Sequence, residues 1–382
     1  QLAAVGVTFL FLMYLRKKLR EFNKFDEIKE PNLLSYLDLV ALGTVCDVVE
    51  LKRYNRFFVQ KGLELIHKRY HKGIAKLIDN SKISSSPTSQ DLGFIVGPQI
   101  NAASRIDDSS LASKLLISND IEQVESISRK LFLLNEKRKL IESQILDDAN
   151  NQAANQSSSN FILVFGNNWH QGVLGIIASK IKDIYYKPTI VISFSNNIGV
   201  GSARSIENVD LGKIILNAKT ENFLISGGGH SMAAGLKINF SNIENFKNYL
   251  EKSLSLYPKN LFDRIDYFDS VITPNELNLD LINGIEQLQP FGKGNPEPVF
   301  ILKDVNIDSI KIIKNKHILI FFENNIGDKI KGICFNSNKT ILGDYLEKYN
   351  QYKFYFSCTV TIDKFTSEPL PQIIIRDIMK ID

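Results

Sequence analysis

The stretch FILVFGNNWHQGVLGIIASKIKDIYYKPTIVISF, residues 161–194, decides the fold class. A short apolar run, FILVF, is followed by a polar turn, a segment of helical periodicity and a second apolar run, TIVISF. Strands that alternate with helices at this spacing predict a compact α/β domain built around a sheet. Two segments continue the pattern: GVGSARS, residues 199–205, as a strand edge or turn, and DLGKIILNA, residues 210–218, as another helix.

Upstream of this domain the sequence predicts one long helix. Over residues 121–149, apolar positions such as Val124, Leu131 and Ile145 recur at spacings of three, four or seven, with charges between them. At about 1.5 Å per residue this helix would extend roughly 40 Å, the length of a connector between domains. The polar run NNQAANQSSSN, residues 150–160, is expected to end it as a linker.

Downstream of the α/β domain the pattern becomes β-rich. Residues 257–382 contain several short apolar segments with polar turns, which predicts a small barrel. A chain of 382 residues is long enough for two or three domains, since single cores rarely grow past roughly 250 to 300 residues. We therefore expect an α/β protein of several domains.

The composition indicates a globular protein, with 44% hydrophobic and 23% charged residues, and its net charge of +4 does not by itself indicate nucleic acid. Cys46, Cys334 and Cys358 form no disulfide or zinc pattern, which fits a reducing, cytoplasmic setting. The apolar run of residues 2–15 is shorter than the ~20 residues of a membrane span, and basic residues follow it rather than precede it. A buried amphipathic or core helix is expected there instead of a membrane anchor.

Two segments of the α/β domain carry residues suited to an anion. Ser202 and Arg204 stand two apart in an extended segment, so a hydroxyl and a bidentate guanidinium share one face. A surface strand with an ion pair is the competing interpretation. His170 stands on a strand-to-helix turn, where ligands collect in such folds, and the alternative is a histidine that caps its own turn.

A third segment of this domain, GGGHSMAAG, is rich in glycine. Successive N–H groups of Gly227, Gly228 and Gly229 could form a concave nest, and a helix starting near Ser231 would add its positive end. His230 could then donate to an anion held there. Tight turns use glycine too, so this run gains weight only beside the other anion candidates.

Two further candidates lie upstream. Asn101 and Arg105 stand at a helical spacing of four, either as a phosphate contact or as the solvated face of a core helix. Asp47 stands inside an apolar, β-branched run, where a lone buried carboxylate is costly unless it is paired or bound to a metal. From the residues alone, a metal ligand and a buried salt bridge are equally open.

Six segments of the chain form an ordered set. They are LDLVALGTVCDVVEL (37–51), GPQINAASRIDD (97–108), WHQGVLGIIASKI (169–181), GSARS (201–205), GGGHSMAAG (227–235) and QPFGKGNPEPVF (289–300). In order and approximate spacing this set resembles the RecJ family of bacterial single-stranded-DNA-specific exonucleases, in the DHH phosphoesterase superfamily. The match extends over nearly the whole chain, so the resemblance is specific.

The resemblance implies an organisation and a reaction. Residues 1–80 would be the C-terminal part of the DHH catalytic domain, 81–155 the helical connector, 156–256 the DHH-associated substrate-binding domain and 257–382 an OB-fold nucleic-acid-binding domain. The implied activity is Mn²⁺- or Mg²⁺-dependent hydrolysis that releases nucleotides from the 5′ end of single-stranded DNA, in DNA repair and recombination. A cytoplasmic monomer is implied, with single-strand-binding protein and a helicase as partners.

The family motifs also imply roles for single residues. Asp47 would be a catalytic carboxylate ligand of a two-metal centre. Ser202 and Arg204 would bind the terminal phosphate, and Arg105 a backbone phosphate. The run from Gly227 to His230 would cradle the nucleotide. Asn101 and His170 lie within matching motifs as substrate-binding candidates, His170 without a firm role.

The family's metal-binding motifs are the main departure. Its Asp-x-Asp motif, an isolated Asp and the Asp-His-His triplet have no counterpart in the sequence and would precede Gln1. Two-metal hydrolysis needs several carboxylate and histidine ligands. We therefore expect an N-terminally incomplete chain that is inactive alone. Cys46, Glu50 and Ser104 replace the family's usual alanine, proline and glycine without removing a ligand or charge.

Two alternatives remain open. One is a short-oligonucleotide or cyclic-dinucleotide phosphodiesterase of the same superfamily, which shares the glycine-histidine signature. The other is a non-catalytic single-strand-binding module, in which aromatic and basic residues of the barrel stack on bases and neutralise phosphates. The residues named for that second role are Phe321, Phe322, Lys311 and Lys314.

Overall fold

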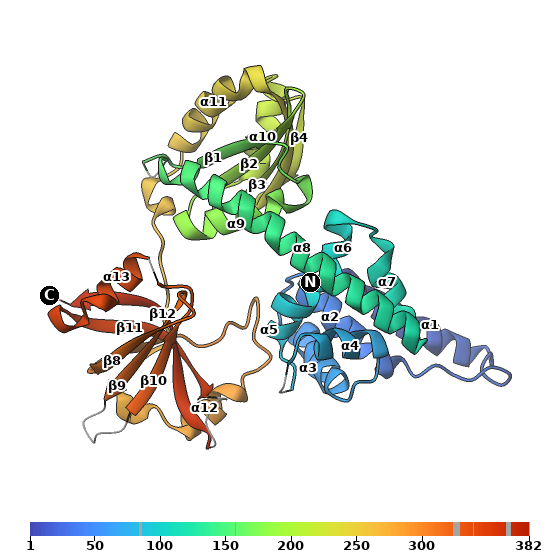
Figure 1. Ribbon diagram of the computed structural model, residues 1–382. Coiled ribbons are helices and arrows are strands. Elements are labelled where there is room, and N and C mark those ends of the chain that lie inside the picture. The colour runs from blue at the N-terminus through green and yellow to red at the C-terminus, as the bar shows by residue number, and fades with distance from the viewer. Residues whose placement is uncertain (84–85, 157, 324–328, 339, 364–367, 382) are drawn as a thin grey trace. The chain divides into compact units, whose positions relative to one another are not determined.

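The computed structural model describes every residue except 84–85, 157, 324–328, 339, 364–367 and 382 (Figure 1). The chain divides into two compact units. One comprises residues 1–70, 86–93 and 266–382, and the other comprises 71–85 and 94–265.

The second unit contains the predicted α/β domain. Its five strands are β1 (Ile162–Asn167), β2 (Thr189–Ser195), β3 (Ile198–Arg204), β4 (Ser226–His230) and β5 (Ala233–Asn239). They form one sheet in the order β1-β2-β3-β5-β4, in which β1 and β2 are parallel and the other pairs antiparallel. The α/β fold class predicted from the sequence is confirmed.

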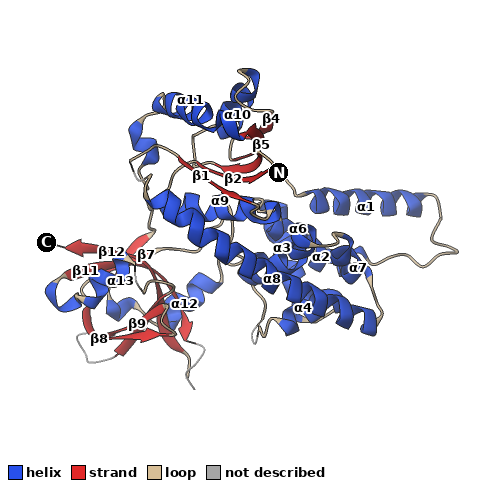
Figure 2. Ribbon diagram, turned by 45° about the horizontal axis from the view of Figure 1, so that its top comes forward, coloured by secondary structure: helices blue, strands red, loops and turns tan. Residues whose placement is uncertain are grey.

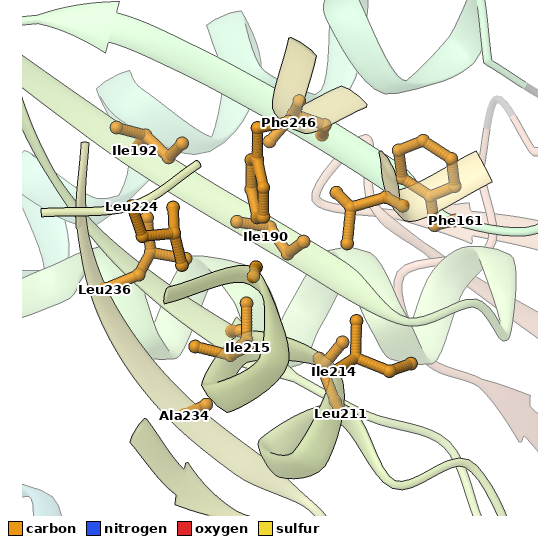
Figure 3. Packing of buried hydrophobic residues seen from close by; sticks show 14 of the residues in the cluster. Phe161, Ile190, Ile192, Leu211, Ile214, Ile215, Leu224, Ala234, Leu236 and Phe246 are labelled. Carbon is orange, nitrogen blue, oxygen red and sulfur yellow. The ribbon is translucent and has the colours of Figure 1, made fainter. Parts of the chain in front are cut away.

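Helices cover both faces of this sheet. Figure 2 shows the sheet between α9 (Gln171–Tyr185) on one side and α10 (Leu211–Thr220) and α11 (Ile243–Ser255) on the other. Side chains alternate along the strands: Ile162 packs toward α9, and Leu163 belongs to the core against α10 and α11. The latter core, centred on Ile190, Ile215 and Phe246, is drawn in Figure 3. The sheet is therefore held rigidly enough to present side chains at its ends.

The helices before the sheet belong to the same unit. They are α4 (Lys72–Asn80), α6 (Gly97–Ile106), α7 (Ser110–Ile117) and α8 (Ile121–Ala154), the last of 34 residues. The prediction that α8 ends at 149 and gives way to a linker is wrong. Ala149 and Ala153 are buried, and the side-chain amides of Gln152 and Gln156 exchange hydrogen bonds with the backbone of β1, so the polar run continues the helix.

The first unit begins with α1 (Ala4–Glu21), α2 (Leu37–Cys46), α3 (Arg53–His67) and the short α5 (Ser89–Asp91), with a π-helical turn following at Leu92–Val96. The expectation that the apolar run of α1 is buried is largely wrong, because only Gly6 and Phe9 are buried. The helix carries apolar side chains on all its faces but packs against the protein on one side only, which leaves Phe11 and Tyr14 exposed. In the described part of the chain, no helix combines the length and apolar character needed to cross a membrane.

The C-terminal part of the first unit is a seven-stranded sheet. Its strands are β6 (Ser270–Ile272), β7 (Phe300–Leu302), β8 (Asn306–Ile313), β9 (His317–Glu323), β10 (Lys329–Cys334), β11 (Lys353–Asp363) and β12 (Leu370–Ile381). The order is β6-β7-β11-β12-β10-β9-β8, with β10 and β12 parallel. A meander, β8 to β10, followed by α13 (Ile341–Glu347) and two more strands is the arrangement of an OB fold, a partly open barrel. The predicted small barrel is thus confirmed.

Shorter helical elements complete the described chain. They are α12 (Leu279–Glu286) and the 3₁₀ turns Leu33–Tyr36, Phe240–Asn242, Lys259–Phe262, Pro274–Glu276 and Tyr349–Gln351. The segment after α12 returns to the helices of its own unit. The Leu51 amide donates to the Lys293 carbonyl at 2.7 Å, and the hydroxyl of buried Ser89 donates to the Phe291 carbonyl at 2.6 Å. The QPFGKGNPEPVF segment therefore ties the barrel to α3 and α5.

Candidate nucleic-acid interface

Ser202 and Arg204 lie on the face of β3 that meets α9. The Nη1 of Arg204 donates to the Ser202 hydroxyl at 3.1 Å and to the Ala203 carbonyl at 2.8 Å. A Cβ added to Gly175 of α9 would lie 2.8 Å from Nη2 of Arg204 and 3.2 Å from Oγ of Ser202. Glycine at this position lets the helix pass close over the pair. The structure thus places the predicted hydroxyl and guanidinium on one face.

Arg105 reaches the same helix from α6. Its Nη1 donates to the Gly172 carbonyl at 2.9 Å. Burial lowers the pKa of the Arg105 guanidinium, Arg138 lowers it further, and Glu142 raises it. Burial and then the charge of Arg105 lower the pKa of Arg204. Two half-buried cations that repel one another favour a doubly negative ligand, and a terminal phosphate has that charge near neutral pH.

A row of residues crosses the sheet beside these cations. Ser202 on β3, Gly235 on β5 and Gly228 on β4 lie opposite one another in register. A Cβ built on Gly228 has no neighbour within 4 Å, and one on Gly235 meets a single backbone oxygen at 4.0 Å. At Gly235 and Gly228 this face of the sheet is therefore bare backbone, open to a ligand that must approach closely.

The glycine run does not form the predicted nest. Gly227, Gly228 and Gly229 belong to the edge strand β4, and a turn leads directly to β5, so no helix begins near Ser231. Strand alternation gives the glycines different roles. A Cβ on Gly227 would lie 2.8 Å from Ile215 in α10, and one on Gly229 would lie 2.3 Å from the Ala233 carbonyl. Of the three, Gly228 faces the open side.

Two histidines border this region. His230 ends β4 with an exposed side chain. His170 is the N-cap of α9, and its Nδ1 accepts from the Gly172 amide at 3.2 Å. The interpretation of His170 as a residue that caps its own turn is therefore confirmed. In the neutral ring this leaves the proton on Nε2, which can donate outward. Asn101 is exposed on α6, one turn before Arg105.

Asp47 belongs to the other compact unit. It caps the C-terminus of α2 and is exposed, so the expectation of a buried lone carboxylate there is wrong. The buried acid of this helix is Asp38, whose carboxylate accepts from the Leu39 amide at 2.7 Å. In the described residues no three His, Cys, Asp or Glu side chains are grouped to hold a metal ion. One carboxylate cannot complete an oxygen shell, so these residues alone do not fit a two-metal centre.

The sequence interpretation missed a polar group on α8. Asn135, Arg138 and Glu142 are buried, and Lys180 of α9 pairs with Glu142 at 2.6 Å. The sequence could have indicated this group, because the three residues continue the three- and four-residue spacing of the buried apolar positions that begins at Val124. Polar residues at such positions indicate buried contacts.

Family models and curated proteins similar to this chain identify its family. A family model described as the DHHA1 domain matches residues 158–256, and one described as the RecJ OB domain matches residues 268–377. The single-stranded-DNA-specific exonuclease RecJ of Haemophilus influenzae is 33% identical over 100% of this chain and 68% of its own length. The chain belongs to the RecJ family. The Escherichia coli RecJ is 31% identical, again over 100% of this chain and 67% of its own.

Solved RecJ structures share the fold. RecJ of Thermus thermophilus in complex with Mg²⁺ superposes with a TM-score of 0.78 at 23% identity, over 94% of this chain and 54% of that one. An exonuclease RecJ bound to manganese superposes with a TM-score of 0.54 at 27% identity, over 63% of this chain and 60% of that one. The chain thus spans about two thirds of its curated RecJ relatives and about half of the Thermus chain.

Proposed function

We propose that this chain binds the 5′-phosphorylated end of single-stranded DNA as part of a metal-dependent 5′-to-3′ exonuclease of repair and recombination. The arginine pair carries the proposal: Arg105 and Arg204 are half buried and repel one another. Arg105 donates to the Gly172 carbonyl of α9, and Arg204 lies beside Ser202, next to the open backbone at Gly235 and Gly228. A site of this kind suits a dianionic phosphate attached to a strand. Its RecJ relatives are named single-stranded-DNA-specific exonucleases, which supports a single-stranded DNA substrate and an exonuclease activity.

In this proposal each residue has a defined task. Arg204 offers its fork to two oxygens of the terminal phosphate, and Ser202 adds a neutral donor to a third. Arg105 neutralises the adjacent phosphodiester. The bare face at Gly228 lets the sugar-phosphate backbone lie against the sheet, and His230 at its border can donate a hydrogen bond. Phosphate contacts of this kind fix register without reading base sequence.

The barrel carries a separate candidate contact for a single strand. Phe321 of β9 lies half buried on the outer face, directly opposite Lys331 of β10, and exposed Lys311 shares this face. Lys314 is exposed in the turn after β8. Phe322 is fully buried in the barrel core, so its predicted stacking role is wrong. We propose base stacking on Phe321 with phosphates near Lys311 and Lys314.

The cofactor of the complete active site would be Mg²⁺ or Mn²⁺, the ions named for the solved RecJ structures. Such ions polarise the phosphodiester and activate water. We propose Asp47 as one ligand, with the others supplied from outside the residues that the structure describes. The same proposal includes a monomer in the cytoplasm, with single-strand-binding protein and a helicase as partners.

Equilibrium binding tests the proposal without catalysis. Fluorescence anisotropy of labelled 5′-phosphoryl and 5′-hydroxyl oligodeoxythymidylate, measured in EDTA, should give at least a tenfold lower Kd for the phosphorylated strand. Both affinities should fall steeply with salt, because phosphate binding releases counterions. Equal affinities for the two ends would contradict the proposed end recognition.

A further inference from the structure

The buried stripe of α8 is polar at its centre. It runs at alternating spacings of four and three through Val124, Ser128, Leu131, Asn135, Arg138, Glu142, Ile145 and Ala149. Asn135, Arg138 and Glu142 are 4%, 9% and 5% exposed. Well-packed apolar residues often replace a buried ion pair with no loss of stability. Stability alone therefore does not account for three adjacent polar positions in this stripe.

These residues form one hydrogen-bonded network. Nε and Nη2 of Arg138 donate to Oδ1 of Asn135 at 3.2 and 3.0 Å, and Nη1 donates to Oε2 of Glu142. The other carboxylate oxygen of Glu142 accepts from Nζ of Lys180 on α9 at 2.6 Å. Glu142 thus joins α8 to the helix whose Gly175 packs over Arg204.

The network is linked through α9 to the arginines proposed to bind phosphate, because Lys180 of this helix pairs with Glu142 and its Gly172 carbonyl accepts from Arg105. Arg138 and Glu142 act on Arg105 with opposite signs, the first lowering and the second raising its pKa. The charge of Arg105 in turn lowers the pKa of Arg204. Glu142 is therefore the carboxylate that offsets repulsion within this group. Without its charge, Arg138 would remain as an unpaired buried cation near Arg105.

We propose that Glu142 is a positioning residue for the end-binding arginines. It holds Arg138 and α9 in place, so that Arg105 stays on the Gly172 carbonyl and Arg204 stays beside Ser202 before DNA arrives. Preorganised donors lose less entropy on binding than mobile ones. The inference rests on the proposed function, because it assigns these arginines to the 5′ phosphate.

The first test compares two glutamate variants on the same helix. Glu142→Gln should reduce the ratio of affinities for 5′-phosphoryl and 5′-hydroxyl strands at least tenfold. The control, Glu136→Gln, breaks an exposed pair with Lys139 and should leave the ratio unchanged. A purely electrostatic role of Glu142 predicts the opposite sign, since the variant gains positive charge. An unchanged or increased ratio would overturn the proposal.

A second variant separates positioning from folding. The double variant Arg138→Met with Glu142→Leu leaves no unpaired charge buried in α8. If Glu142 only supports the fold, this variant should recover the wild-type preference; the proposal predicts that the preference stays lost while the protein remains folded.

A crystal structure of Glu142→Gln gives a readout that does not depend on DNA. Arg105 should leave the Gly172 carbonyl, and an unmoved Arg105 and Arg204 would overturn the inference. If the wild-type chain shows no preference for a 5′ phosphate, the proposed function fails, and this structure still decides whether Glu142 positions the arginines.

Discussion

Arg204 on β3 and His230 on β4 lie opposite the same residue, Ala233 of β5, which stands between them. Residues in register on adjacent antiparallel strands project on one face, so both side chains border the same open surface. The guanidinium donates to the Ser202 hydroxyl and the Ala203 carbonyl and lies close to Gly175 of α9, and the imidazole marks the sheet edge. A strand end held by Arg204 would therefore cross the small side chain of Ala233 before it reaches His230.

Arg204→Lys should abolish most of the preference for a 5′ phosphate. The charge remains, but the planar fork that contacts two phosphate oxygens is lost. A hydrogen bond to a charged group contributes about 1.5–3 kcal/mol, so the Kd for the phosphorylated strand should rise roughly ten- to hundredfold. Anisotropy titrations check this, and the 5′-hydroxyl strand serves as the control because its affinity should change little.

Gly228 and Gly229 should respond differently to the same substitution. Gly228→Val adds a β-branched side chain where no atom lies within 4 Å, so the melting temperature should change little. The side chain would stand on the open face and weaken DNA binding. Gly229→Val would place its Cβ 2.3 Å from the Ala233 carbonyl and should lower the free energy of unfolding by several kcal/mol, about 3 or more.

Paired measurements of melting temperature and Kd distinguish the two glycines. A large loss of stability in Gly228→Val would contradict the open face described for β4. Normal DNA affinity in a folded Gly228→Val variant would contradict its use as a binding surface.

Phe321 and Phe322 offer a second matched pair. Phe321→Ala should leave the barrel folded and weaken single-strand binding by about 1–3 kcal/mol, the contribution of one stacked base. Phe322 is fully buried, so Phe322→Ala should destabilise the domain by about 3–5 kcal/mol. Urea unfolding and strand titrations measure the two effects. Unaltered strand affinity in Phe321→Ala would remove the stacking role.

Cysteine chemistry provides an independent check of burial near Asp47. Burial raises the pKa of Cys46 to about 11 and that of Cys358 to about 12. At pH 8 both thiols are therefore mostly protonated, and the thiolate is the reactive form. Alkylation of the folded protein should be slow at pH 8 and faster as the pH rises toward 11. Rapid labelling of Cys46 at pH 8 would show that α2 is less packed than described.

Much of the fold could be predicted from local sequence pattern. Periodicity identified α8, the alternation of strand and helix identified the sheet, and the β-rich C-terminal part indicated a barrel. The ends of the elements were harder to predict, because tertiary contacts set them. Gln152 in the last turns of α8 and Gln156 just beyond its end both bond to β1, which no local pattern encodes.

The sequence predicted which residues form the candidate site better than it predicted how they are arranged. Ser202 and Arg204 share a face because a strand alternates its side chains, and this needs no tertiary information. The glycine run was compatible with a nest or a strand, and pairing with β5 determined the outcome. Whether Asp47 is buried depended on which segments cover α2, and spacing in the sequence does not contain that information.

In the proposed function this chain holds the 5′-phosphorylated end of a single strand at Ser202 and Arg204. A crystal structure of the chain with 5′-phosphorylated oligodeoxythymidylate would show where that end binds. We expect the terminal phosphate between the Ser202 hydroxyl and the Arg204 guanidinium, with the next phosphodiester near Arg105 and the strand crossing Gly228. A strand bound by its 3′ end, or a terminal phosphate placed away from Arg204, would contradict the account.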